Sequence, residues 1–205
     1  MFFDNNTKER LHTTYSWIYW DDLFSADELE ILRSQVSSEL YPATIMGSSD
    51  REEVEKVRIS DIKFYTRDDI TSWVFDKFNY IISLINERYY GFNLNGYDVF
   101  QYTQYDSHNS GKYDWHMDTI LGNNLQNADR NQTRKLTVVM LLSEPEKDFT
   151  GGELCFPELG LQFKPEPNDM LVFRTTYDHY NKSVLSGVKY SYMDHIMLAP
   201  ESFIP

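Results

Sequence analysis

The spacing of apolar residues changes part-way along this 205-residue chain, and that change limits the folds open to it. After residue 92, short apolar or alternating segments repeat with a period of two, which is typical of β-strands with one buried face. Turn-forming residues such as Gly, Pro, Asn and Asp separate these segments. The predicted strands cover about 97–105, 134–143, 152–156, 159–163, 169–174, 177–184 and 188–198.

The residues before this change show helical periodicity instead. Residues 25–40 begin with a capping-box spacing, Ser25 to Glu28, and continue with apolar residues three to four positions apart. Residues 69–90 carry an apolar stripe that ends before Gly91, a residue type that often terminates helices. Both segments are therefore predicted to be helices.

A charged stretch over 47–58 separates these helices, and we expect it to be a loop that leads into a short strand over 57–65. Helices first and many short strands afterwards favour an α+β fold, in which helices support an antiparallel barrel or a two-sheet jelly roll. A chain of this length is most simply one domain. We therefore predict a single domain over 1–205, with helical support from 1–91 and a jelly-roll core over 92–200.

Charge and cysteine content exclude some classes of function. The chain has 32 acidic and 19 basic residues, which give a net charge of −13. An acidic surface repels phosphate backbones, so we expect no binding to double-stranded nucleic acid. The single cysteine, Cys155, cannot form an intrachain disulfide and fits a reducing compartment. No apolar run has the length of a signal peptide or a membrane helix, so we expect a cytoplasmic protein that does not bind membranes.

One short stretch, YDWHMDT at 113–119, places a histidine two residues before an aspartate. On an extended segment, residues i and i+2 point to the same face, about 7 Å apart. His116 and Asp118 could then bind one ion together, because imidazole and carboxylate suit Fe(II), Mn(II) or Zn(II). The remaining histidines are the candidates for a third ligand: His12, His108, His179 and His195.

The surroundings of these four histidines differ. His12 lies in a polar N-terminal arm, and His108 lies in a loop rich in Gly, Ser and Asn. His195 sits on an apolar strand, where a packed histidine is the usual case. His179 begins a strand that follows an apolar run. From the residues alone the third ligand stays open.

Several longer motifs occur together in a fixed order. They are YDWHMD, RKLTVVMLLSEP, GGELCF and NDMLVF, followed by His179-x7-Gly187-x-Lys189-x-Ser191. In order and spacing they resemble the Fe(II)/2-oxoglutarate-dependent dioxygenases. The likeness is greatest to the prolyl 4-hydroxylase-like branch, which includes small bacterial and viral members of PKHD type. It runs from about residue 97 to residue 198 and extends more loosely over the N-terminal helices.

This resemblance implies a double-stranded β-helix (jelly-roll) core with a mononuclear iron site. His116, Asp118 and His179 would form its 2-His-1-carboxylate triad, which leaves open positions on Fe(II) for 2-oxoglutarate and O2. Related halogenases lack the carboxylate, so the presence of Asp118 favours hydroxylation over halogenation. The resemblance also implies ascorbate as an optional reductant.

Lys189 is the residue that the resemblance implies for the far carboxylate of 2-oxoglutarate. Prolyl 4-hydroxylases of the collagen type have Lys at this position, whereas most bacterial relatives have Arg. We expect residues 185–187 to turn a hairpin between the last two strands, which would place Lys189 opposite about Ser183, roughly 13 Å along the strand from His179. A lysine side chain and a five-carbon dicarboxylate together span most of that distance, and their contact would be charge-assisted.

Further side chains are predicted near the site. The resemblance aligns Tyr105 with a tyrosine that hydrogen-bonds the same carboxylate in some relatives, and strand alternation points Thr137 toward the cosubstrate. Tyr113 and Trp115 flank the first ligand pair, where either could line the substrate cleft or pack in the core. The long loop over 119–133 holds Gly, Asn and Asp, so we expect a mobile lid over the site.

The sequence also departs from the family pattern at several positions that are not proposed ligands. The Pro-Ser that usually follows the phenylalanine is replaced by Arg174-Thr175. The usual Val and Pro after the distal histidine are Asn181 and Ser183, and a Trp common on the last strand is His195. We expect these changes to reshape the pocket.

The activity that the resemblance implies is oxidative decarboxylation of 2-oxoglutarate to succinate and CO2, coupled to hydroxylation of a substrate C–H bond. A prolyl residue in a peptide or protein is the first substrate to expect, and a free amino acid or small metabolite is the alternative. Two other interpretations are a non-catalytic jelly-roll binding module, which has no reason to keep Lys189, and a cupin-like metal enzyme. Cupins commonly carry a His-x-His pair, which this sequence lacks. The sequence does not indicate an oligomeric state.

Overall fold

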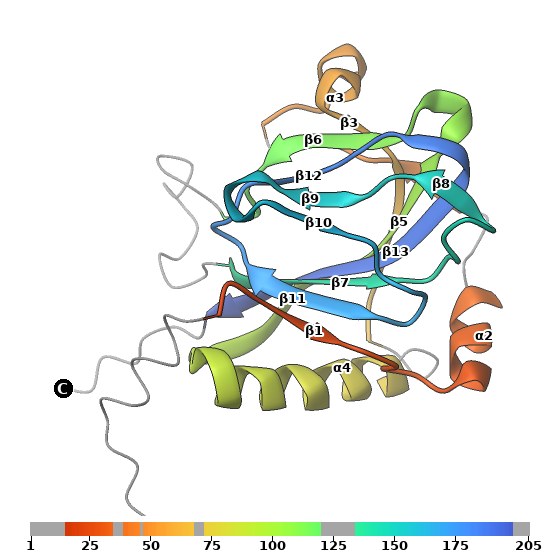
Figure 1. Cartoon of the computed structure of the whole chain (residues 1–205). Coiled ribbons are helices and arrows are strands. Elements are labelled where there is room, and N and C mark those ends of the chain that lie inside the picture. Colours follow the sequence, from red (N-terminus) through yellow and green to blue (C-terminus); the bar gives the residue numbers. More distant parts are fainter. Residues whose placement is uncertain (1–14, 35–38, 46, 68–71, 120–133, 199–205) are drawn as a thin grey trace, which may run out of the picture.

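The computed structural model describes residues 15–34, 39–45, 47–67, 72–119 and 134–198. These residues form two antiparallel β-sheets that face each other, with the long helix α4 (Ser72–Ile85) outside the larger sheet (Figure 1). The fold is the α+β jelly roll expected from the sequence. His12 and nearly all of the predicted lid, residues 120–133, lie outside the described residues.

The larger sheet contains the long strands of the C-terminal half. Its central strand, β13, pairs with β7 on one side and with β5 on the other, and its first residues also pair with β8. The strand order is β1 (Trp17–Trp20), β11 (Met170–Arg174), β7 (Arg134–Leu141), β13 (Val184–Leu198), β5 (Leu94–Asp106), β4 (Asp61–Tyr65) and β2 (Tyr41–Pro42), with β8 (Phe149–Gly151) off this path.

The smaller sheet is made of short strands and carries two of the predicted metal ligands. Its order is β10 (Leu161–Phe163), β9 (Leu154–Phe156), β12 (His179–Asn181), β6 (Lys112–His116) and β3 (Arg58–Ile59). Because β12 pairs with β6 in antiparallel register, His179 lies directly opposite His116.

Each predicted strand after residue 92 overlaps a strand of the structure, but the predicted hairpin over 185–187 is wrong. The strand β12 pairs with β6 and β9 in the smaller sheet, whereas β13 pairs with β5, β7 and β8. The chain therefore crosses from one sheet to the other between Asn181 and Val184. A spacing of a few residues predicts a tight turn but does not say which partner each strand takes.

Both predicted helices are present, but residues 39 and 40, which were predicted as the end of the first one, are not helical. In α2 (Ala26–Ser34), the backbone N–H of Ser25 donates to Glu28 Oε2 at 2.8 Å and that of Glu28 donates to Ser25 Oγ at 3.3 Å, so the capping box forms. The helix α4 continues as a π-helical turn, η1 (Asn86–Tyr90), which ends at Gly91 in the left-handed conformation. Short 3₁₀ turns, η2 (Ser107–Asn109) and η4 (Pro157–Leu159), join strands.

The charged stretch predicted as a loop is in part a helix, α3 (Arg51–Val57). Asp50 caps it by accepting a hydrogen bond from the Glu53 backbone N–H at 3.1 Å. Arg51 and Glu55 form an ion pair one turn apart. The many charged residues obscured the pattern of this short helix, in which Val54 is the buried residue. None of the described helices has the length and apolar character needed to cross a membrane.

Strand alternation gives the larger sheet two buried faces. Its outer face, with residues such as Phe100 and Val138, packs against the apolar stripe of α4. Its inner face looks toward the smaller sheet, where Phe173 packs against Phe156. Thr137 therefore points away from α4 and into the space between the sheets, and so do the other predicted site residues on these strands: Tyr105 and Lys189.

The segment before residue 92 also supplies strands to both sheets. The predicted strand over 57–65 divides at Ser60 into β3, which pairs with β6, and β4, which pairs with β5. The chain here crosses between the two sheets, as it does after β12. Strand β1, which sequence periodicity did not indicate, pairs with β11 at the edge of the larger sheet.

Candidate active site

The three predicted metal ligands meet at one end of the space between the sheets. His116 is the last residue of β6 and His179 is the first of β12, and their rings lie 4.2 Å apart between centroids. Asp118 follows β6 by two residues and is buried. One potential ligand atom from each of the three residues lies within 4.8 Å of the others. The structure thus brings together residues that are up to 63 positions apart.

Backbone carbonyls orient both imidazoles. His116 Nδ1 lies 2.7 Å from the Asp114 carbonyl oxygen, and His179 Nδ1 lies 3.0 Å from that of Tyr177. A ring nitrogen that donates to a carbonyl carries the proton, which leaves Nε2 as the free donor of an electron pair. The two Nε2 atoms face Asp118, at 3.5 Å for His116 and 3.4 Å for His179.

Asp118 is held by groups from the larger sheet and the segment after it. Its backbone N–H donates to the Thr175 carbonyl at 3.1 Å, and its Oδ2 accepts a hydrogen bond from Thr137 Oγ1 at 2.7 Å. The Thr137 hydroxyl, which we expected from strand alternation to face the cosubstrate, donates to this carboxylate in the structure. The hydroxyl thus helps to orient Asp118, one of the predicted metal ligands.

A third imidazole lies against the same carboxylate. His195 Nε2 is 3.4 Å from Asp118 Oδ1, and His195 is only 5% exposed. It sits on β13 directly opposite Thr137 on β7. The sequence analysis predicted a packed histidine, which its burial confirms, but it missed this contact. The signal that could have found it is strand alternation along β13, because Lys189, Ser191 and His195 are all buried on the same side.

The electrostatics of the cluster favour the forms that bind metal. Burial and the neighbouring His179 lower the pKa of His116 to about 4, so its imidazole is neutral. Burial alone would raise the pKa of Asp118, but the facing imidazoles of His179 and His195 hold that pKa well below its ordinary value. Two imidazole nitrogens and a carboxylate oxygen that converge on one point fit a divalent metal, and this donor set is typical of non-haem Fe(II).

Lys189 is buried, 6% exposed, and points into the same interior from β13. Its Nζ donates to the Gly152 carbonyl at 2.7 Å and to Asn181 Oδ1 at 2.8 Å. Tyr105 lies opposite Lys189 on β5, with its ring centroid 5.6 Å from Nζ. Burial lowers the pKa of Lys189 to about 8 and raises that of Tyr105 to about 12.

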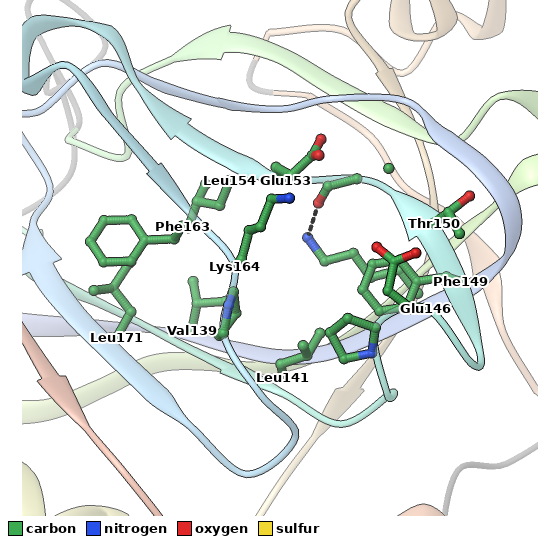
Figure 2. A pocket seen from close by; sticks show the side chains of 15 residues that line it. Val139, Leu141, Glu146, Phe149, Thr150, Glu153, Leu154, Phe163, Lys164 and Leu171 are labelled. Carbon is green, nitrogen blue, oxygen red and sulfur yellow. Dashed lines mark hydrogen bonds between the residues drawn. The ribbon is translucent and has the colours of Figure 1, made fainter.

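Figure 2 shows the small cavity beside Lys189, with a volume of about 60 Å³. Val139 and Leu141 of β7 form one wall, and Leu154 of the smaller sheet lies across from them. The lysine is therefore a cation in largely apolar surroundings, where a carboxylate partner would interact strongly with it.

Known proteins with a similar sequence or fold identify the class of enzyme to which this site corresponds. Residues 100–196 match the sequence profile of the 2OG-Fe(II) oxygenase superfamily, and they contain the triad, Lys189 and Tyr105. The chain carries a 2OG-Fe(II) oxygenase domain. The cofactor of this oxygenase is Fe(II), and its cosubstrates are 2-oxoglutarate and O2. A comparison of the sequence with curated proteins gives no match.

Solved structures with the same fold include prolyl hydroxylases. A viral collagen prolyl hydroxylase from Paramecium bursaria Chlorella virus-1, in complex with 2OG, has a TM-score of 0.66 at 19% identity and covers 92% of this chain and 99% of that chain. A prolyl-4-hydroxylase from Pseudomonas putida has a TM-score of 0.69 at 18% identity, with 90% and 94% covered.

A third structure was solved with a bound peptide. It is a Trichoplax adhaerens prolyl hydroxylase in complex with a fragment of the hypoxia inducible factor oxygen degradation domain. Its TM-score is 0.69 at 15% identity, with 95% of this chain and 93% of that chain covered. At such identities the likeness to these structures establishes a shared double-stranded β-helix fold.

The oxygenase has a second cavity, of about 280 Å³, beside Asp118. Gln101 and His195 contribute to it from the larger sheet, and Arg58 and Tyr113 contribute from the smaller one. Its position next to the carboxylate of the triad makes it the candidate substrate pocket.

The two aromatic residues predicted near the triad lie on different faces of β6. The Tyr113 ring stacks on His116 at 3.5 Å between centroids and lines this cavity. Trp115 is 56% exposed and stacks on Tyr180 at 5.2 Å, away from the residues that line the cavity. Of the two candidates, Tyr113 is therefore the one beside the triad.

Proposed function

We propose that this oxygenase hydroxylates a prolyl residue in a peptide or protein while it converts 2-oxoglutarate to succinate and CO2. The observation that carries the reaction class is the convergence of His116, Asp118 and His179 at one point. The prolyl substrate is supported by three solved structures that share the fold and are named as prolyl hydroxylases.

In this proposal His116, Asp118 and His179 hold Fe(II), which supplies O2 activation and a binding position for the keto acid end of 2-oxoglutarate. Thr137 and His195 keep Asp118 facing the two imidazoles. Lys189 receives the distal carboxylate of the cosubstrate.

Tyr105 is proposed to assist Lys189. Its hydroxyl stays protonated at neutral pH because burial raises its pKa to about 12, so it can donate to the same carboxylate. The apolar side chains of Leu141 and Leu154, on opposite sides of the cavity, exclude water from the region around the lysine, which strengthens the charge-assisted contact.

The cavity beside Asp118 is the proposed place of the substrate. Phe64 and Met117 line it and are partly exposed, at 43% and 37%, so they offer apolar contacts near its opening. A pyrrolidine ring needs such contacts, while the peptide carbonyls on either side need hydrogen-bond donors. Arg58, Arg134 and Gln101 are potential donors in the same cavity.

A second candidate substrate is a free amino acid or small metabolite with a carboxylate, and Arg58 favours it. Arg58 is 6% exposed, and its Nη2 has no hydrogen-bond partner among the described residues. Its Nε donates to Ser60 Oγ at 2.8 Å, and the guanidinium lies 4.6 Å over the Tyr113 ring. A buried guanidinium with an unused donor is suited to a carboxylate oxygen.

We further propose that residues 1–205 act as one domain in a reducing, cytoplasmic compartment. The support is that strands from 15–65 are built into both sheets and that Cys155 is buried as a free thiol.

The test is anaerobic visible absorption of the metal-free protein, with Fe(II) added first and 2-oxoglutarate second. A weak charge-transfer band that needs both additions, and that is lost in His179→Ala, is the expected result. Absence of the band would overturn the oxygenase assignment of these residues. Succinate release is then measured with proline-containing peptides and with free proline, so that the two candidate substrates are separated.

A further inference from the structure

Asn181 is a partly buried polar residue in the smaller sheet, close to the predicted metal ligands. It is the last residue of β12, two positions after His179. Its neighbour Tyr180 faces the outer surface, where it stacks on Trp115. By strand alternation, Asn181 faces the interior on the side of His179. A half-buried amide inside the barrel therefore needs a partner, and it has one in Lys189.

The hydrogen bond from Lys189 fixes which way the amide points. An ammonium group has donors and no acceptor, so the amide oxygen of Asn181, and not its nitrogen, faces Nζ at 2.8 Å. The amide NH2 then points away from the lysine. No described residue accepts a hydrogen bond from it.

Lys189 itself keeps one donor available. Two of its three N–H groups are directed to the Gly152 carbonyl and to Asn181 Oδ1. A carboxylate has two oxygens and about four acceptor positions, so one ammonium donor leaves most of them unsatisfied. In surroundings as apolar as these, a second donor beside the first has a large effect.

The distance from the triad matches the length of the cosubstrate. Two positions along a strand span about 7 Å, so the Asn181 backbone lies roughly that far from the backbone of His179. An extended five-carbon dicarboxylate bound to the metal at one end would bring its other end to this region. Lys189 from one sheet and Asn181 from the other then meet the same carboxylate.

We infer that Asn181 is a second binding group for the distal carboxylate of 2-oxoglutarate, with its amide NH2 donating beside Lys189. This inference rests on the proposed function, because it presumes that the dicarboxylate binds between the triad and the lysine. In this role Asn181 would help the site to bind 2-oxo acids that have a distal carboxylate in preference to those that lack one.

The test compares Asn181→Val with the unchanged protein in anaerobic titrations of the Fe(II)-loaded form, followed by the charge-transfer band and by calorimetry. Loss of a hydrogen bond to a charged group is expected to raise the Kd of 2-oxoglutarate by about 10- to 100-fold. Asn181→Asp should weaken binding further, because its carboxylate would pair with Lys189 and repel the ligand.

Pyruvate separates a binding role from a structural one. It has the keto acid end of 2-oxoglutarate but no distal carboxylate, so its affinity should be the same in Asn181→Val and the unchanged protein. Tyr180→Phe is the matched control, because it alters the adjacent residue on the outward side of β12. It should leave both affinities unchanged.

The outcomes separate the inference from the function on which it rests. If Lys189→Met weakens 2-oxoglutarate binding and Asn181→Val does not, the inference is wrong and the proposed function stands. If Asn181→Val weakens 2-oxoglutarate and pyruvate equally, Asn181 acts by maintaining the site and the inference is also wrong. If the unchanged protein shows no 2-oxoglutarate-dependent band, the proposed function itself fails.

Discussion

Asp118 is fixed by more groups than either histidine of the triad. Each imidazole relies on one backbone carbonyl, whereas the Asp118 segment is held through its own N–H, the Thr137 hydroxyl and the imidazole of His195. This difference has a physical reason. Asp118 follows β6 rather than belonging to it, so the strand ladder does not hold it in place.

Thr137→Val tests this support. Valine has nearly the same shape but no hydroxyl, so Asp118 Oδ2 loses its donor at 2.7 Å. Loss of such an outer partner typically costs about 10- to 100-fold in metal affinity, and we expect that range in calorimetric titrations with Mn(II). Thr150→Val, which removes an exposed hydroxyl bonded to Ser186, is the control. Equal metal affinity in the two variants would contradict the role given to Thr137.

The buried ammonium of Lys189 makes cosubstrate binding dependent on pH. Burial lowers its pKa to about 8, so the group is charged below that pH and neutral above it. Because the charged form binds the carboxylate, affinity for 2-oxoglutarate should be constant below about pH 7 and fall by up to about tenfold per pH unit above about pH 8.

Kd values measured between about pH 6.5 and about pH 9.5 check this expectation. Lys189→Arg keeps a positive charge throughout that range and should remove the decline. Pyruvate, which lacks the distal carboxylate, should show no decline in the unchanged protein. A decline that persists in Lys189→Arg would mean that another group titrates.

At the scale of elements, the first part of β13 depends on a glycine. Gly187 has φ of +69°, and a Cβ built on it would lie 1.9 Å from the Asp148 carbonyl oxygen. Gly187 pairs with Phe149 of β8, and the pairing of β13 with β5 begins at the next residue, Val188. The close approach of β8 to β13 therefore requires the absence of a side chain.

Gly187→Ala should lower the free energy of unfolding by about 3 kcal/mol or more, because a backbone clash adds to the strain of the left-handed conformation. Gly160→Ala is the matched control, since Gly160 has φ of +63° but no atom within 4 Å of the added Cβ. It should cost about 1–2 kcal/mol. Denaturant unfolding measures both, and similar losses in the two variants would refute the clash.

At the scale of the molecule, the candidate metal site joins the two sheets. His116 and His179 belong to the smaller sheet, and the carboxylate of Asp118 contacts Thr137 and His195 of the larger one. A metal held by all three ligands would therefore stabilise the packing of one sheet on the other. Its binding energy would appear as stability of the whole fold.

Thermal unfolding tests this linkage with Mn(II), which occupies such sites without reacting with O2. At a free concentration of about 100 times Kd, binding adds about 2.7 kcal/mol of stability. For a domain of this size we expect a rise in Tm of about 5–10 °C. His179→Ala should abolish the rise. A rise that survives in His179→Ala would place the stabilising ion elsewhere.

The fold and the metal ligands were largely predictable because both follow from local patterns. Period-two segments gave the strands, and a capping box with a glycine terminator gave the helices. The triad depended on motif order, which fixed His179 where residue chemistry alone left several histidines open. The closeness of His116 and His179 follows from the pairing of β12 with β6, because the two residues occupy opposite positions in the register.

The features missed from the sequence depend on which strands pair. The hairpin at 185–187 was wrong because β12 and β13 take partners in different sheets. The contact of His195 with Asp118 arises from pairing between β13 and β7, which no local pattern specifies. The hydrogen bond between Lys189 and Asn181 likewise joins two sheets. Sequence periodicity gives the face of a residue but not its neighbour across the interior.

The crossing at Ser60, where β3 and β4 meet, has a consequence for how such a protein can diversify. Arg58 and Phe64 from this crossing line the cavity beside Asp118, yet both lie outside residues 100–196, the part that matches the superfamily. These two residues, with Thr44 and Ile45, form the part of the cavity lining that is encoded apart from the matched stretch, which contains the triad and the rest of the lining. Substitutions at these four positions change one wall of the cavity and leave His116, Asp118, His179 and Lys189 in place, so this wall can diversify while the residues proposed to bind iron and cosubstrate are kept.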